Sequence, residues 1–114
     1  MKHYWGLLAI VLVDQLSKWY MREYFSVVWN QRGGFGLLVG VWLYIVYEWI
    51  KEGQGIKKWA KGFIVAGGLS NLIDRVVFGA VRDFIYYPVV SIYGNIADIF
   101  LVLGVLILIV KRKT

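Results

Sequence analysis

The chain has 114 residues, of which 60% are hydrophobic and 18% aromatic, and its formal net charge is +6. One domain, residues 1–114, fits this length, but a soluble globule of that size cannot bury so much apolar surface, which indicates lipid as the solvent. The absence of cysteine excludes disulfide bonds and thiol catalysis. The single histidine, His3, excludes a histidine-cluster zinc site, and we expect no cofactor.

Four apolar runs predict an all-α membrane protein, a bundle of four transmembrane helices. The runs are Tyr4–Tyr20, Gly36–Ile50, Gly62–Val77 and Ile96–Val110. Each is close to or below the roughly 17–25 residues of a membrane span, and tryptophans near the run ends lengthen the effective span. The first run resembles a signal peptide, but no small-residue cleavage site follows it, so we interpret it as an uncleaved span.

The positive charges lie mainly between the runs, which fits membrane orientation better than nucleic-acid binding. With the N-terminus inside, the cytoplasmic segments hold eight cations: Lys2, Lys51, Lys57, Lys58, Lys61, Lys111, Arg112 and Lys113. The outer side then holds five: Lys18, Arg22, Arg32, Arg75 and Arg82. This bias predicts that both termini are cytoplasmic.

The outer segments Met21–Phe35 and Val81–Gly94 are rich in aromatic and β-branched residues. Such composition predicts short strands, and Pro88 limits any strand across it to a sheet edge. We therefore expect a small β platform on the outer membrane surface.

All four aspartates, Asp14, Asp74, Asp83 and Asp98, fall near the outer face in this orientation. A charge at membrane depth costs roughly 2.5–3.5 kcal/mol on insertion scales, so their shared position needs an explanation. Each acid also has a purely structural interpretation.

Local spacing indicates which side chains share a helix face. Asp14 and Lys18 are four residues apart, which suits either an ion pair inside the bundle or a supporting role in a site. Asp74 lies three residues after Asn71 and beside Arg75, where a structural network is favoured over direct chemistry. Glycines at positions 67 and 68 indicate close helix packing.

Asp83 and Asp98 are the remaining pair. Taken singly, they suit loop solvation and the N-terminal charge of a helix. Taken together, with Asn95 one turn before Asp98, they suit an acid pair. Two aspartates that share a proton lose their protons at different pH values, so one is ionised while the other is still protonated. One can then activate water while the other protonates the carbonyl or the leaving amine, which is metal-free peptide hydrolysis. Serine catalysis is disfavoured because Ser17 and Lys18 are helix neighbours that point about 100° apart.

Several segments together resemble the lipoprotein signal peptidases (signal peptidase II) along nearly the whole chain. They are Asp14-Gln15-Leu16-Ser17-Lys18, Asn30-Gln31-Arg32-Gly33-Gly34-Phe35-Gly36, Asn71-Leu72-Ile73-Asp74-Arg75, Val81-Arg82-Asp83-Phe84-Ile85 and Asn95-Ile96-Ala97-Asp98. The resemblance implies removal of the signal peptide from diacylglyceryl-prolipoproteins, on the N-terminal side of the lipidated cysteine. It also implies a bacterial inner-membrane location. The orientation derived above puts the active site near the outer face, and we expect a monomer because one chain can complete the site.

The resemblance also assigns roles to residues. Asp83 and Asp98 match the catalytic dyad, and Asn95 matches the residue that orients Asp98. The supporting and substrate-binding set is Asn71, Arg75, Asp74, Asn30, Asp14 and Lys18. The chain departs from the family pattern at Arg32, Ser70 and Gly94, and its outer loops are shorter, which implies a reduced β platform and covering segment.

Two other classes of protein remain as alternatives. A small four-helix ion-coupled transporter or channel normally places an acid in mid-membrane, whereas here the acids gather towards one interface. A non-catalytic lipoprotein-binding relative has the same fold, but the four intact aspartates favour the enzyme.

Overall fold

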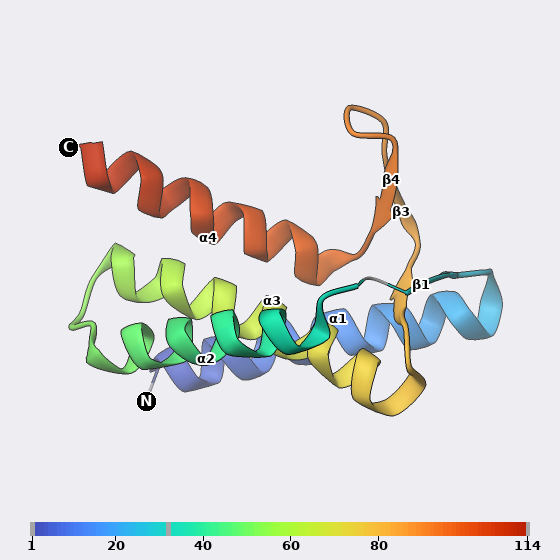
Figure 1. Cartoon of the computed structure of the whole chain (residues 1–114), viewed down its shortest axis with the longest axis horizontal. Coiled ribbons are helices and arrows are strands. Elements are labelled where there is room, and N and C mark those ends of the chain that lie inside the picture. Colours follow the sequence, from blue (N-terminus) through green and yellow to red (C-terminus); the bar gives the residue numbers. More distant parts are fainter. Residues whose placement is uncertain (1, 32, 114) are drawn as a thin grey trace.

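The structure is a computed structural model that describes residues 2–31 and 33–113. Within these residues it contains four helices and four short strands (Figure 1). In chain order they are α1 (Lys2–Tyr24), β1 (Val28–Asn30), α2 (Phe35–Lys51), α3 (Ile56–Phe78), β2 (Val81–Asp83), β3 (Ile85–Tyr87), β4 (Ile92–Gly94) and α4 (Ile96–Lys113). The fold is therefore mostly helical with small antiparallel strand pairs, as the sequence indicated.

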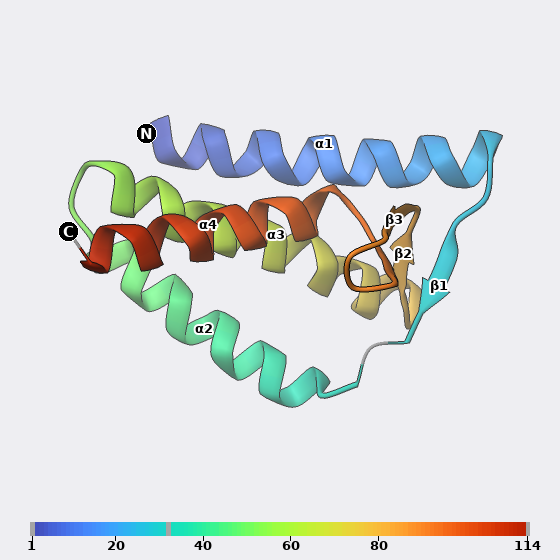
Figure 2. The same cartoon turned by 90° about the horizontal axis from the view of Figure 1, so that it is seen from above.

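Helix α3 is the centre of the bundle, because it packs against each of the other three helices. Figure 2 shows α1 and α2 on opposite sides of it, with the N-terminal end of α2 diverging from the bundle. The buried core where α1 meets α3 consists of Ile10, Val11 and Ala66, with partly buried side chains such as Phe63 and Phe100 around it.

Two adjacent glycines set how closely α3 approaches its neighbours. A Cβ atom at Gly67 would lie 2.6 Å from the carbonyl oxygen of Ala97 in α4. A Cβ atom at Gly68 would lie 2.6 Å from Cδ1 of Trp42 in α2, whose indole nitrogen donates to the Val65 carbonyl at 2.9 Å. Only glycine permits both approaches, which confirms the packing role indicated by the sequence.

The strands form two antiparallel pairs at one end of the bundle. Strand β1 pairs with β2 in the register Val28↔Asp83, and β3 pairs with β4 in the register Ile85↔Gly94. The β3–β4 hairpin projects beyond the N-terminal end of α4 (Figure 1). Strand β3 ends at Tyr87, directly before Pro88, so no strand crosses the proline.

The helices extend further than the four apolar runs. Helix α3 begins six residues earlier than the run Gly62–Val77, at Ile56, and α1 continues to Tyr24. By length and hydropathy, no helix in the described part of the chain qualifies as a membrane span. Arg32, counted among the outer cations, lies outside the described residues.

Candidate active site

The N-terminus of α4 carries a reciprocal cap built from Asn95 and Asp98. The backbone N–H of Asp98 donates to Oδ1 of Asn95 at 3.1 Å, and the backbone N–H of Asn95 donates to Oδ2 of Asp98 at 3.0 Å. This is a capping box, which satisfies two backbone donors that the helix start would otherwise leave without partners. The spacing of three residues therefore has a structural cause, and it fixes both side chains in front of the helix.

Asp83, the last residue of β2, is fully buried and lies next to this cap. Its Oδ1 accepts a hydrogen bond from Nδ2 of Asn95 at 2.7 Å. Its Oδ2 accepts one from Nδ2 of Asn30 at 3.0 Å. Asn30 reaches this carboxylate because β1 pairs with β2.

Asp98 is only partly buried, and its Oδ1 accepts a hydrogen bond from Nδ2 of Asn71 at 3.0 Å. Nδ2 of Asn95 also donates to Oδ1 of Asn71 at 3.0 Å. Asp83 and Asp98 are therefore joined through the side chains of Asn95 and Asn71. We call these four residues together with Asn30 the Asp–Asn network.

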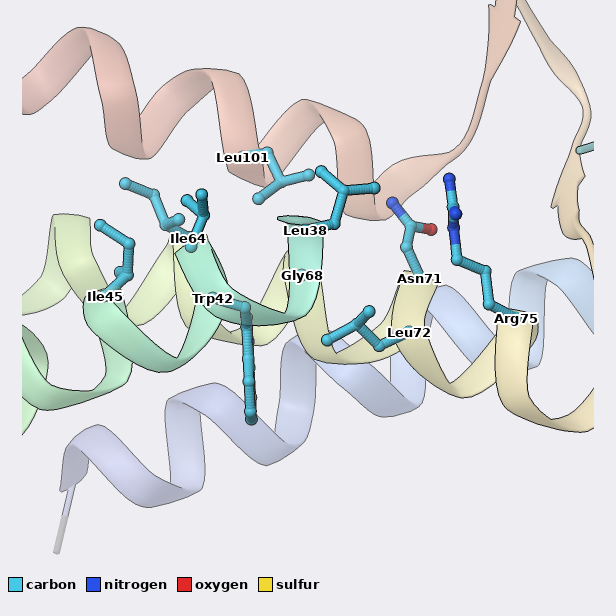
Figure 3. Close-up of a pocket in the computed structure, with 10 residues that line it drawn as sticks. Leu38, Trp42, Ile45, Ile64, Gly68, Asn71, Leu72, Arg75 and Leu101 are labelled. Carbon is cyan, nitrogen blue, oxygen red and sulfur yellow. The ribbon is translucent and has the colours of Figure 1, made fainter. Parts of the chain in front are cut away.

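Two apolar cavities adjoin the Asp–Asn network. The larger, about 810 Å³, lies between the β3–β4 hairpin and α4, and Asp98 is part of its lining together with Asn30, Tyr87 and Leu101. The smaller, about 170 Å³, lies between α2, α3 and α4. Figure 3 shows the side chains of Asn71 and Arg75 at one end of it and apolar side chains at the other. The partly exposed carboxylate of Asp98 therefore opens on a large, mostly apolar space.

A buried ionic cluster supports the network from the side of α1. Nζ of Lys18 lies 2.6 Å from Oδ2 of Asp14 and 3.3 Å from Oδ2 of Asp74, and all three side chains are fully buried. Nζ also donates to Oδ1 of Asn71 at 3.0 Å. Oδ1 of Asp14 in turn accepts from the backbone N–H of Ala97 in the first turn of α4, at 2.8 Å. Asp14 and Lys18 thus form the expected ion pair inside the bundle, and they also contact the residues around the aspartates.

Asp74 has a partner that the sequence did not indicate. The Arg82 guanidinium holds both carboxylate oxygens of Asp74, with Nη2 2.8 Å from Oδ1 and Nε 3.2 Å from Oδ2. Nη2 of Arg82 also donates to Oε1 of Gln15 at 2.6 Å. The guanidinium of Arg75 lies 5.9 Å from the centre of the Phe35 ring, and Arg75 lines the smaller cavity.

Arg82 and Gln15 are two of the polar residues near the site that the spacing arguments missed. Nε2 of Gln15 also donates to Oδ1 of Asp74, at 3.0 Å. Both residues stand directly beside acids that were singled out, Arg82 before Asp83 and Gln15 after Asp14. This adjacency to the acids was the sequence signal that could have identified both residues.

Comparison with known proteins identifies the class of this chain. A family model described as "Signal peptidase (SPase) II" matches residues 7–112. The lipoprotein signal peptidase of Syntrophomonas wolfei is 31% identical over 94% of this chain and 90% of its own length. That of Listeria welshimeri is 29% identical over 100% of this chain and 97% of its own length. The chain is therefore an aspartic peptidase.

Its fold agrees with this class. Two solved structures, both described as a bacterial membrane enzyme, superpose with TM-scores of 0.85 and 0.84 and cover 97% of this chain. They cover 87% and 92% of their own chains at identities of 23% and 24%, so they show the fold alone. With the family model spanning almost the whole sequence, the chain belongs to the signal peptidase II family.

Proposed function

We propose that this protein removes the signal peptide from diacylglyceryl-modified bacterial prolipoproteins, cutting on the N-terminal side of the lipidated cysteine. Membership of the signal peptidase II family supports the reaction. The observation that carries the assignment to residues is the connection of Asp83 to Asp98 through Asn95 and Asn71, with Asp98 open to the larger cavity.

Asp83 and Asp98 are the proposed catalytic dyad. One carboxylate accepts a proton from a water molecule whose oxygen attacks the scissile carbonyl carbon. The other acid donates a proton to the leaving amine as the C–N bond breaks. Each carboxylate is held by two hydrogen-bond donors from different segments, which supports fixed positions for both during the reaction.

The larger cavity is the proposed binding site for the lipid-bearing part of the substrate. Its lining is mostly apolar and includes Ile99, Val102 and Leu103 of α4, which suits acyl chains. Asn30 and Asp98 lie in the same lining, so a substrate bound there brings its backbone beside the dyad. A monomer is part of the proposal, which is supported by the hydrogen bonds that join Asp83, Asp98 and the three asparagines within one chain.

The four helices are the proposed spans of the bacterial inner membrane, with both termini cytoplasmic and the site near the outer face. The charged side chains of Asp14, Lys18 and Asp74 are fully buried, so α1 and α3 turn apolar side chains outward. Large apolar residues are exposed on these helices and on α2, with Leu37 and Val76 each 74% exposed. Exposed apolar surface on this scale is typical of lipid contact.

Aspartate-to-asparagine variants test the dyad. Asp83→Asn and Asp98→Asn should each abolish cleavage of a purified diacylglyceryl-prolipoprotein in a gel-shift assay, because neither amide can exchange the required proton. Insertion and folding in detergent should be retained with some loss of stability, since the shape is nearly unchanged but the new NH2 group faces a donor that the carboxylate had accepted from. Glu23→Gln, an exposed acid of α1, is the matched control and should cleave as the wild type does.

Each contrary outcome has a separate meaning. Near-wild-type turnover by either variant would remove that aspartate from the dyad. Substrate binding by the wild-type protein without cleavage would indicate a non-catalytic relative. Proton-coupled uptake into liposomes without peptide cleavage would indicate a transporter.

A further inference from the structure

Tyr87 and Gly94 lie diagonally opposite each other on the β3–β4 hairpin. The register pairs Ile85 with Gly94 and Tyr87 with Ile92, which puts these side chains on one face. Diagonal neighbours on a face are within reach of an aromatic side chain. A Cβ atom at Gly94 would collide with Cε2 of Tyr87, so the ring occupies the space of the missing side chain.

The Tyr87 ring is also a neighbour of Asp98. The same Cβ position at Gly94 would lie 2.7 Å from Oδ2 of Asp98. The ring edge and the carboxylate therefore both lie next to this one position. Both residues line the larger cavity, in which the substrate is proposed to bind.

The Tyr87 hydroxyl contacts the residue that connects the two aspartates. It donates a hydrogen bond to the backbone carbonyl of Asn95 at 2.9 Å. The backbone N–H of Asn95 holds Oδ2 of Asp98, and its side chain holds Oδ1 of Asp83. A shift of the Asn95 main chain would therefore displace donors to both carboxylates at once.

We propose that Tyr87 is a positioning residue for peptide hydrolysis, acting through Asn95, and that Gly94 provides the space its ring needs. This inference rests on the proposed function. The hydroxyl fixes the main chain of Asn95, and the ring forms the cavity wall beside Asp98. Misplacement of a catalytic group by about 1 Å can cost on the order of 100-fold in rate, so one such contact affects turnover.

The alternative is that Tyr87 only stabilises the hairpin, and the opposite face offers a matched control. There Tyr86 pairs with Tyr93, with 5.1 Å between the ring centres, and Tyr86 is half exposed and does not line either cavity described above. Tyr86→Phe and Tyr87→Phe each remove one phenolic hydroxyl, from neighbouring residues of the same strand. A difference between them therefore reports on the contact with Asn95.

The experiment measures kcat, KM and thermal unfolding in detergent with a diacylglyceryl-prolipoprotein substrate. Tyr87→Phe should lower kcat about 3- to 10-fold, the effect of one hydrogen bond, with nearly unchanged KM and at most a small fall in unfolding temperature. Tyr87→Ala should also raise KM, because the cavity loses part of its wall. Tyr86→Phe should match the wild type in all three quantities.

Wild-type kcat for Tyr87→Phe would overturn the inference. So would a loss of activity that only follows a loss of folded protein. Failure of the proposed function has a different signature, because then the wild type and Tyr86→Phe would be inert as well.

A second measurement does not depend on turnover. The backbone amide NMR signal of Asn95 in detergent micelles should shift in Tyr87→Phe and stay in place in Tyr86→Phe. An unmoved signal in Tyr87→Phe would overturn the positioning role even if the enzyme assay gave no activity.

Discussion

Lys18 of α1 donates a hydrogen bond to Asn71 of α3, with 3.0 Å between Nζ and Oδ1. The same ammonium group is ion-paired with Asp14 and Asp74. Asn71 in turn donates to Asp98. A single buried cation therefore connects the charged interior of the bundle to the proposed dyad.

Replacing this cation should destabilise the protein strongly. Lys18→Met leaves Asp14 and Asp74 buried without their shared countercharge, and removing one partner of a buried pair typically costs about 3–5 kcal/mol. Chemical unfolding in detergent measures the effect. Lys57→Met, at an exposed position, is the control and should change little. Equal stability of the two variants would contradict the role given to Lys18.

Arg82 should not tolerate replacement by lysine. Its guanidinium contacts both oxygens of Asp74 and also Gln15, a geometry that a single ammonium cannot reproduce. Arg82→Lys should lower the free energy of unfolding by about 1–3 kcal/mol. Arg22→Lys is the matched change at an exposed arginine and should have a smaller effect. Indistinguishable unfolding curves for the two variants would show that the paired contact is unimportant.

Gly67 should not tolerate substitution by alanine. A Cβ atom there would collide with the Ala97 carbonyl oxygen at 2.6 Å, and overpacking typically costs about 1–3 kcal/mol. Gly67→Ala should therefore unfold at lower denaturant concentration. Gly40→Ala is the control, because an added Cβ meets nothing within 4 Å there, and alanine favours helix. If Gly67→Ala were as stable as Gly40→Ala, the close approach of α3 and α4 would be incorrect.

The contact between Glu52 and Lys61 predicts a small pH dependence of stability. The hydrogen bond from Nζ of Lys61, 2.6 Å from Oε1, is the main cause that lowers the pKa of Glu52. A lowered folded-state pKa gives stabilisation that is present above the ordinary pKa and is lost as pH falls through the folded value.

Glu52→Gln should therefore unfold at a lower temperature than the wild type above about pH 5, and the difference should shrink below about pH 4. Thermal unfolding across this range measures it. A difference between the two proteins that grows on acidification would have the wrong sign for this interaction.

The helices were predictable because long apolar runs are compatible with few other structures. The positions at which the helices begin and end were not predictable. The first turn of α3, from Ile56, is rich in lysine, and the apolar pattern alone excluded it. The strands followed from composition, whereas their pairing did not. Partners such as Val28 and Asp83 are far apart in the sequence, and nothing local encodes their register.

Spacing located part of the candidate site. The interval between Asn95 and Asp98 correctly indicated a local pair, because a capping box is a short-range pattern. A structural network around Asp74 was expected, but short-range spacing did not indicate that Arg82 belongs to it. The Arg82 contact needs the turn after α3 to be known in three dimensions.

The Asp–Asn network draws its members from segments that begin at Asn30 and end at Asp98. A growing polypeptide therefore cannot assemble the proposed dyad until the start of α4 has been synthesised and seated against Asp14. Copies that stop before the start of α4 should be proteolytically silent, so peptidase activity should appear during biosynthesis only after Asp98 has been added.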